Sequence, residues 1–163
     1  MNTAVRAKAM AIALGQGFAS PHEVVAWVDG LIVDSATTDP SLADASLSER
    51  DLNGLISALE RFAEKTCIDN MEELWAMVLG EFNLWFSDHP RDGPAIARVL
   101  FRMAQDGEVP GAEAEAEMGW FDDAYDLAIA GIHGRVERVE AELRVFLAQY
   151  ANNDNEADLI LNG

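Results

Sequence analysis

Apolar residues recur three or four positions apart through most of the chain, which places them on one face of an α-helix. The most regular stripe runs from Leu52 to Ala63, and a nearly continuous one runs from Met71 to Phe86. No stretch shows the sustained alternation of apolar and polar residues that is typical of a half-buried strand. The pattern therefore predicts an all-α fold, a single-domain bundle of about seven helices.

Capping residues and helix breakers divide this pattern into elements. Ser20-Pro21-His22-Glu23 joins a capping serine to a proline at the first helical position and a glutamate three residues after the serine. Ser48 to Asp51 is interpreted as a second capping box, and Asp69 or Asn70 as the cap of the helix beginning near Met71. The helical patterns fall within residues 1–17, 20–33, 41–47, 52–63, 71–86, 96–106, 112–118 with continuation to 129, and 136–150. Residues 1–151 are thus predicted to form one helical domain, and residues 152–163 a frayed acidic tail.

The balance of charge is the unusual property of the chain. Acidic residues number 29 against 11 basic ones, and the formal net charge is -18. Such a charge repels nucleic-acid phosphates and anionic lipids, so we expect neither nucleic acid nor membrane as a direct ligand. It favours a basic protein partner, whose encounter it would steer. General solubility, or adaptation to high salt, explains the same acidity and stays open as an alternative.

Candidate chemistry is sparse in the sequence. The single cysteine, Cys67, excludes a disulfide within the chain, and we expect it to be a buried structural thiol. His22, His89 and His133 stand in no recognisable metal or catalytic spacing. We therefore expect no metal, no cofactor and no enzymatic activity. A small helical enzyme remains an alternative, and a closed pocket holding at least two groups from these four residues and a carboxylate of raised pKa would favour it.

The location of the protein is predicted from its apolar runs. The run from Ala9 to Leu14 is too short for the apolar core of a good signal peptide. No window approaches the roughly 18 apolar residues that a membrane span needs. We expect a cytoplasmic protein.

One stretch combines acids and aromatic residues without any base. Between Met103 and Gly134 there is no lysine or arginine. Aromatic side chains can anchor a partner while carboxylates steer it and set its register. Alternatively, the aromatic residues belong to the core and the acids form the hydrated face of a helix. The predicted partner-binding residues are Glu113, Glu117, Trp120, Asp122, Asp123, Tyr125 and Asp126.

These features together predict a non-catalytic protein that occludes a basic partner protein. The most concrete version is an immunity or antitoxin-type inhibitor of a toxin. Size, acidity and helical build are similar in style to bacterial immunity proteins, but no residue motif carries the resemblance, so no family is assigned. An acidic mimic of DNA, or a homo-oligomeric (for instance homodimeric) regulatory or structural protein, would have the same composition. An apolar exposed face on the helix from Trp75 to Phe86 would indicate the homo-oligomer.

Overall fold

The structure, a computed structural model, describes residues 2–151. The tail predicted for residues 152–163 therefore lies outside the described residues. Within residues 2–151 the chain forms eight α-helices, one short 3₁₀ helix and no strand, so the all-α prediction is confirmed and the number of helices is close to that expected. The helices are α1 (Thr3–Gln16), α2 (Pro21–Asp34), α3 (Pro40–Ser46), α4 (Leu52–Glu64), α5 (Met71–Asp88), η1 (Pro90–Asp92), α6 (Gly93–Gln105), α7 (Ala112–Ile129) and α8 (Val136–Ala148).

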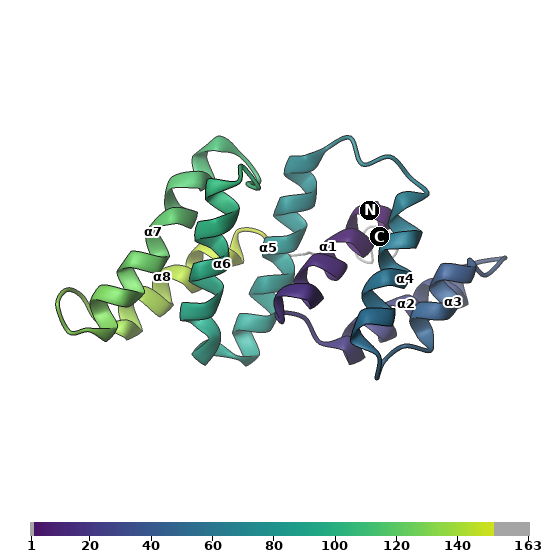
Figure 1. The fold of residues 1–163 in the computed structure, drawn as a ribbon, viewed down its shortest axis with the longest axis horizontal. Helices are drawn as coiled ribbons and strands as arrows, with labels where there is room; N and C mark the ends of the chain where they lie inside the picture. The colour runs from purple at the N-terminus through teal and green to yellow at the C-terminus, as the bar shows by residue number, and fades with distance from the viewer. Residues whose placement is uncertain (1, 152–163) are drawn as a thin grey trace, which may run out of the picture.

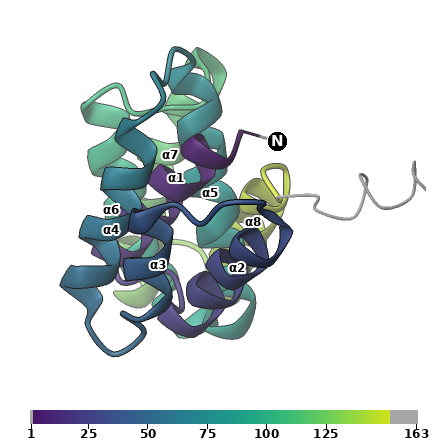
Figure 2. The same cartoon turned by 90° about the vertical axis from the view of Figure 1, so that its right-hand side faces the viewer.

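The helices gather around two hydrophobic clusters that share α1 (Figure 1). One cluster joins α1 to α5, α6, α7 and α8, and the other joins α1 to α2, α3 and α4. Alanines cover much of α1, and Ala7, Ala9 and Ala13 are completely buried. Because these side chains are small, α4 and α5 can both pack closely on α1. Figure 2 views the molecule from the end formed by α2, α3 and α4.

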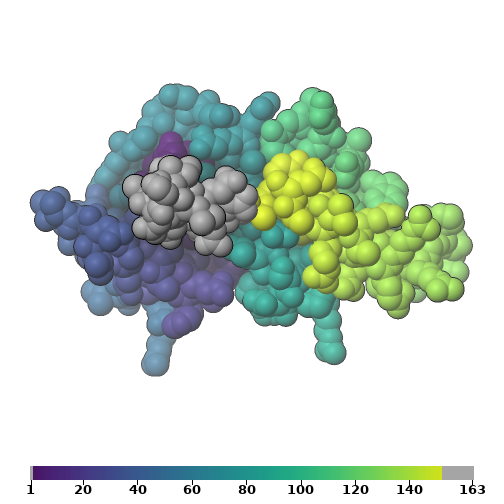
Figure 3. All heavy atoms as spheres, turned by 180° about the vertical axis from the view of Figure 1, so that it is seen from behind, coloured from purple at the N-terminus to yellow at the C-terminus, as the bar shows by residue number. Residues whose placement is uncertain are grey.

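Helix α5 occupies the centre of the larger cluster. Its residues Leu74, Val78 and Phe82 are buried, and the Phe82 ring meets Phe18 edge to face with 5.3 Å between ring centroids. The nearly continuous apolar pattern of this helix agrees with its burial, and its large exposed apolar residues are Met71 and Leu84. Helix α8 packs on α5, and α7 packs on α6. Figure 3 shows α8 (yellow-green) on the surface beside α7 (green), at the end away from α2 and α3.

The helix caps follow the sequence signals in part. Ser20 caps α2 as predicted, and the Oγ atom accepts a hydrogen bond from the Glu23 N–H at 3.4 Å. Asn70, rather than Asp69, caps α5. The capping box assigned to Ser48 is wrong, because α4 begins at Leu52 and its cap is the preceding residue, Asp51.

The burial predicted for Cys67 is also wrong. Cys67 lies exposed between α4 and α5. Its Sγ atom is 3.0 Å from Oδ1 of Asp69, and this hydrogen bond to a carboxylate raises the pKa of the thiol. The apolar stripe of α4 ends before this segment and that of α5 begins after it, so Cys67 lies on neither buried face.

Candidate partner-binding groove

Helices α7 and α8 form an antiparallel hairpin at one end of the molecule (Figure 1). The turn between them contains Gly131 and Gly134, whose φ angles of 71° and 76° lie in the left-handed region that favours glycine. Helix α7 buries Met118 and Phe121 in the larger cluster, and α8 buries Leu143 and Phe146 in the same cluster. Helix α7 packs on α6, and α8 packs on both α5 and α7. A groove lies along the junction of α7 and α8.

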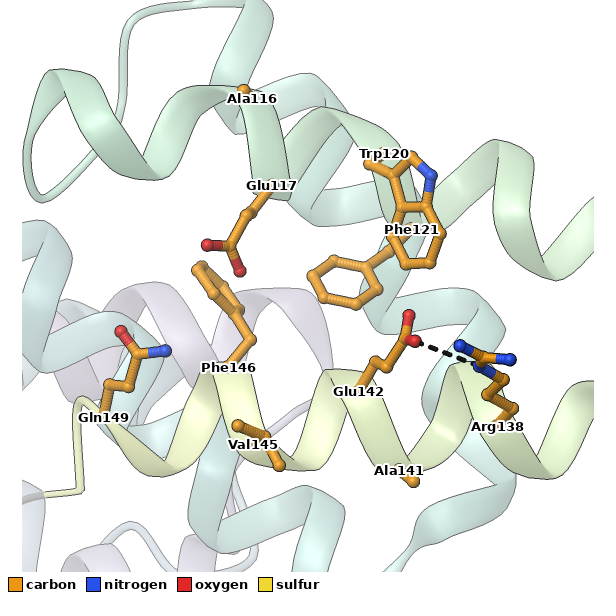
Figure 4. A pocket seen from close by; sticks show the side chains of 10 residues that line it. All are labelled: Ala116, Glu117, Trp120, Phe121, Arg138, Ala141, Glu142, Val145, Phe146 and Gln149. Atoms are coloured by element: carbon orange, nitrogen blue, oxygen red, sulfur yellow. Dashed lines mark hydrogen bonds and ion pairs between the residues drawn. The ribbon is translucent and has the colours of Figure 1, made fainter.

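The groove has a volume of about 660 Å³ and a mainly apolar lining. Figure 4 shows Phe121 and Phe146, both buried, facing one another between the helices, with 5.5 Å between ring centroids. Trp120 stands on the α7 side and Val145 on the α8 side. The complete lining consists of Ala116, Glu117, Trp120, Phe121, Arg138, Ala141, Glu142, Val145, Phe146 and Gln149.

A second hollow of about 440 Å³ continues the groove toward the turn of the hairpin. It shares Trp120, Arg138 and Glu142 with the first hollow, and Leu127 and Val139 add further apolar surface. Trp120 therefore lies between the two hollows. Its side chain is 48% exposed and packs edge to face on Phe121. Ring and groove together form a surface on which an apolar partner group can be buried.

The two walls of the groove differ in charge. The α7 wall carries Glu117 beside the first hollow and Asp123 beside the second, and Glu113 lies one turn before Glu117 on the same face. On the α8 wall, Arg138 Nε and Glu142 Oε1 form an ion pair at 3.4 Å, so their charges sum to zero. Arg135, just before α8, adds a positive charge beside the second hollow. The negative charge of the groove therefore lies on the α7 wall.

The structure divides the acids that the sequence grouped together. Asp122 lines a different hollow on the α6 side of α7, together with Arg98. Partial burial raises the pKa of Asp122, the nearby Asp126 raises it further, and Arg98 opposes both effects. Asp122 lies five positions after Glu117, which is about 140° around the helix axis. Asp122 and Asp126 thus face away from the groove that Glu113, Glu117 and Asp123 border.

Tyr125 is not available as a partner anchor, contrary to the role predicted for it. Its side chain is 2% exposed and packs into the core against the start of α6. Burial raises the pKa of its phenol to about 12. Within residues 2–151 its hydroxyl group finds no hydrogen-bond partner. Trp120 and Tyr125 are five positions apart, which is about 140° around the helix axis. The face of α7 that exposes Trp120 is therefore not the face that carries the buried Tyr125.

The α8 wall of the groove was not predicted from the sequence, since every predicted partner-binding residue lies on α7. A signal was nevertheless present. Val145 lies off the apolar stripe that Val139, Leu143 and Phe146 define, and it is 68% exposed. An apolar residue outside the buried stripe of an amphipathic helix indicates a second apolar surface.

A fourth hollow, of about 210 Å³, lies among α1, α2 and α5. It is lined by the buried charged residues Arg6 and Glu81, and by Trp85, whose ring stacks on His89 at 3.7 Å. Of the histidines and cysteine considered as catalytic candidates, His89 alone lines this hollow, and His133 alone lines the hollow near the hairpin turn. None of these hollows is lined by two members of the set formed by the three histidines and Cys67. In the described part of the chain no group of three or more His, Cys, Asp or Glu side chains could hold a metal ion.

The chain matches no protein-family model, no curated protein and no solved structure. None of the helices within residues 2–151 is both long and apolar enough to cross a membrane. The groove is therefore interpreted from its own geometry and charge.

Proposed function

We propose that the chain is a non-catalytic binding protein that occludes a basic partner protein, and that the partner docks on the groove between α7 and α8. The observation that carries this proposal is the half-exposed Trp120 beside an apolar groove whose α7 wall is acidic. Tryptophan is enriched among the residues that dominate binding energy, and such residues lie at the centre of an interface within a polar rim.

The apolar part of the groove supplies a measurable driving force. A tryptophan side chain buries 150–250 Å² when it is covered, so the exposed half of Trp120 represents roughly 100 Å². At about 25 cal/mol per Å², covering it contributes roughly 2–3 kcal/mol. Val145 and Leu127 add apolar area on either side. This contribution makes Trp120 the natural anchor.

The charge supports a basic occupant over a second copy of the chain. In a two-fold symmetric dimer the same surface of both copies would form the interface, so Glu113 and Glu117 of both copies would lie within it. Like charges placed together across an interface cost several kcal/mol. A partner carrying lysine and arginine converts the same acids into attraction and accelerates association.

The finer version of the proposal is that the partner is a toxin, for example a nuclease. A surface that binds nucleic-acid phosphates must be basic, so an acidic protein that covers it would inhibit the enzyme. Small size, net charge and helical build support this version. Its test is the activity of the captured partner, which the chain should inhibit stoichiometrically.

The docking face is tested with two matched double variants of α7. Glu113→Lys with Glu117→Lys reverses two charges beside the groove, and Asp122→Lys with Asp126→Lys makes the same change on the side facing α6. With the protein captured from the source cell by the immobilised chain, the first pair should slow association by about tenfold and flatten its salt dependence. The second pair should have a clearly smaller effect. Equal effects of the two pairs would mean that the acidity acts generally and is not directed at this face.

A further inference from the structure

We infer that the segment docking in the α7–α8 groove is an amphipathic helix of about three turns, with its basic residues on the flank that faces α7. This inference rests on the proposed function and names the part of the partner that the groove receives. It follows from the composition of the groove lining, from its length and from the unequal charge of its two walls.

The apolar lining selects a helix over an extended segment. Apart from Glu117, Arg138, Glu142 and Gln149, every residue that lines the first hollow is apolar. An extended peptide on the floor of Phe121 and Phe146 would leave backbone N–H and C=O groups without partners, at a cost of a few kcal/mol for each group. A helix satisfies its backbone internally and presents a stripe of side chains to such a groove.

The length of the groove defines how much helix it can hold. The two hollows together extend along α7 from Ala116 to Leu127, which is about 16 Å at a rise of 1.5 Å per residue. Three turns of an incoming helix have this length. Because Trp120 separates the hollows, apolar side chains at positions i and i+4 of the partner would lie on either side of its ring, with a further contact at i+7.

The unequal walls determine which side of the partner helix is basic. Glu117 and Asp123 line the α7 side, and Glu113 lies one turn before Glu117 on the same face of the helix. Toward α8 the partner meets the neutralised Arg138–Glu142 pair, the apolar Val145 and the uncharged Gln149. Arg135 also lines the second hollow beside the turn of the hairpin, and its positive charge repels basic residues from that side. Lysine and arginine therefore belong on the α7 flank, and apolar or neutral residues on the α8 flank. This sidedness also sets the direction in which the helix lies.

Residues 152–163 of the chain itself are the competing occupant. They contain the apolar run Leu159-Ile160-Leu161 and follow closely after Gln149 at one end of the groove. They also contain Asp154, Glu156 and Asp158, which would meet the acids of α7 and be repelled. Charge complementarity thus favours a basic partner segment.

The test uses a display library of 16-residue helical peptides with all surface positions varied, selected on the full-length chain. Enriched peptides should share apolar residues at i, i+4 and i+7, and lysine or arginine along one flank. Their affinity should fall at least tenfold when proline is placed at the centre of the peptide. Their affinity should fall at least tenfold on Trp120→Ala but less than twofold on Leu84→Ala. Leu84 is the matched control, because its side chain on α5 is 47% exposed and lies away from the groove.

The possible outcomes separate the two proposals. Enrichment of basic peptides that lack the apolar stripe, and whose affinity is unchanged by Trp120→Ala, would overturn the helix-in-groove inference. The proposed function would still stand. Selection without enrichment of basic residues would overturn both. Affinity that rises at least tenfold when Leu159→Ser, Ile160→Ser and Leu161→Ser are combined would show the chain's own C-terminal segment in the groove, and the inference would then be wrong about the occupant.

Discussion

Gly93 and Tyr125 make a close contact that places α7 against the start of α6, and it allows a quantitative test of the core beneath the groove. A Cβ atom added at Gly93 would lie 2.2 Å from the Tyr125 hydroxyl oxygen and 2.9 Å from its Cζ atom. Gly93→Ala should therefore destabilise the fold, because overpacking of a core typically costs about 1–3 kcal/mol. The better helix propensity of alanine offsets at most about 1 kcal/mol of this cost.

Tyr125→Phe is expected to have the opposite sign. It removes a buried hydroxyl that has no hydrogen-bond partner in the described residues, and an unsatisfied buried group costs about 1–3 kcal/mol. We expect the variant to be more stable than the wild type by about 1 kcal/mol. Because the substitution also deletes the atom nearest to the added Cβ, Gly93→Ala should cost much less in the Tyr125→Phe background. The coupling between the two changes should reach about 1–2 kcal/mol.

Urea unfolding of the four proteins measures this double-mutant cycle, with midpoints compared at equal m-value. Two results would refute the reasoning. Additivity within about 0.5 kcal/mol would mean that the two residues do not meet as described. A loss of stability in Tyr125→Phe of more than about 1 kcal/mol would mean that the hydroxyl group has a hydrogen-bond partner and contributes to folding.

Three further predictions follow from individual groups and from the total charge. The pKa of Tyr125 is about 12 in the folded state and 10 in the unfolded state, so this titration leaves stability unchanged below pH 10 and lowers it as the pH rises toward 12, because the unfolded state loses its proton first. Urea unfolding between pH 9 and pH 11.5 should therefore show a steeper loss of stability for the wild type than for Tyr125→Phe, and parallel curves would contradict the burial of the phenol. Asp51 accepts a hydrogen bond from the Gly54 N–H at 3.0 Å, so Asp51→Ala should lower the free energy of unfolding by about 0.5–2 kcal/mol, whereas Ser48→Ala should change it by less than about 0.5 kcal/mol. Raising NaCl from about 0.05 M to about 0.5 M should raise the melting temperature, because salt screens the mutual repulsion behind a net charge of -18, and a melting temperature that does not change would show that this repulsion is negligible.

The class of fold was predictable from the sequence because helix formation follows a local period. The stripe through Leu55 and Leu59 in α4 reports directly which residues share a face, and both are completely buried. Caps were predictable where one candidate stands directly before a stripe, as Ser20 does. The prediction failed at Ser48, since Asp51 lies closer to the stripe and its carboxylate satisfies the first turn of α4.

The groove was predictable only in part. The sequence shows that acidic and aromatic residues are interspersed along the helix that contains Trp120. It also shows that Trp120 and Tyr125, five positions apart, lie on different sides of this helix. It does not show which of these two sides another helix covers. That depends on α6 packing against one face of α7, and α6 is a separate segment of the chain.

The sequence by itself therefore determined the helices, the acidity and the amphipathic stripes, all of which depend on residues within a few positions of one another. Only the tertiary structure decided that Trp120 is exposed, that Tyr125 is buried, and that Asp122 and Asp126 face away from Glu113 and Glu117. It also decided that Val145 and Gln149 of α8 complete the groove. The physical reason is that a helix's own period defines its faces, whereas the packing of distant helices selects the faces that remain open to a partner.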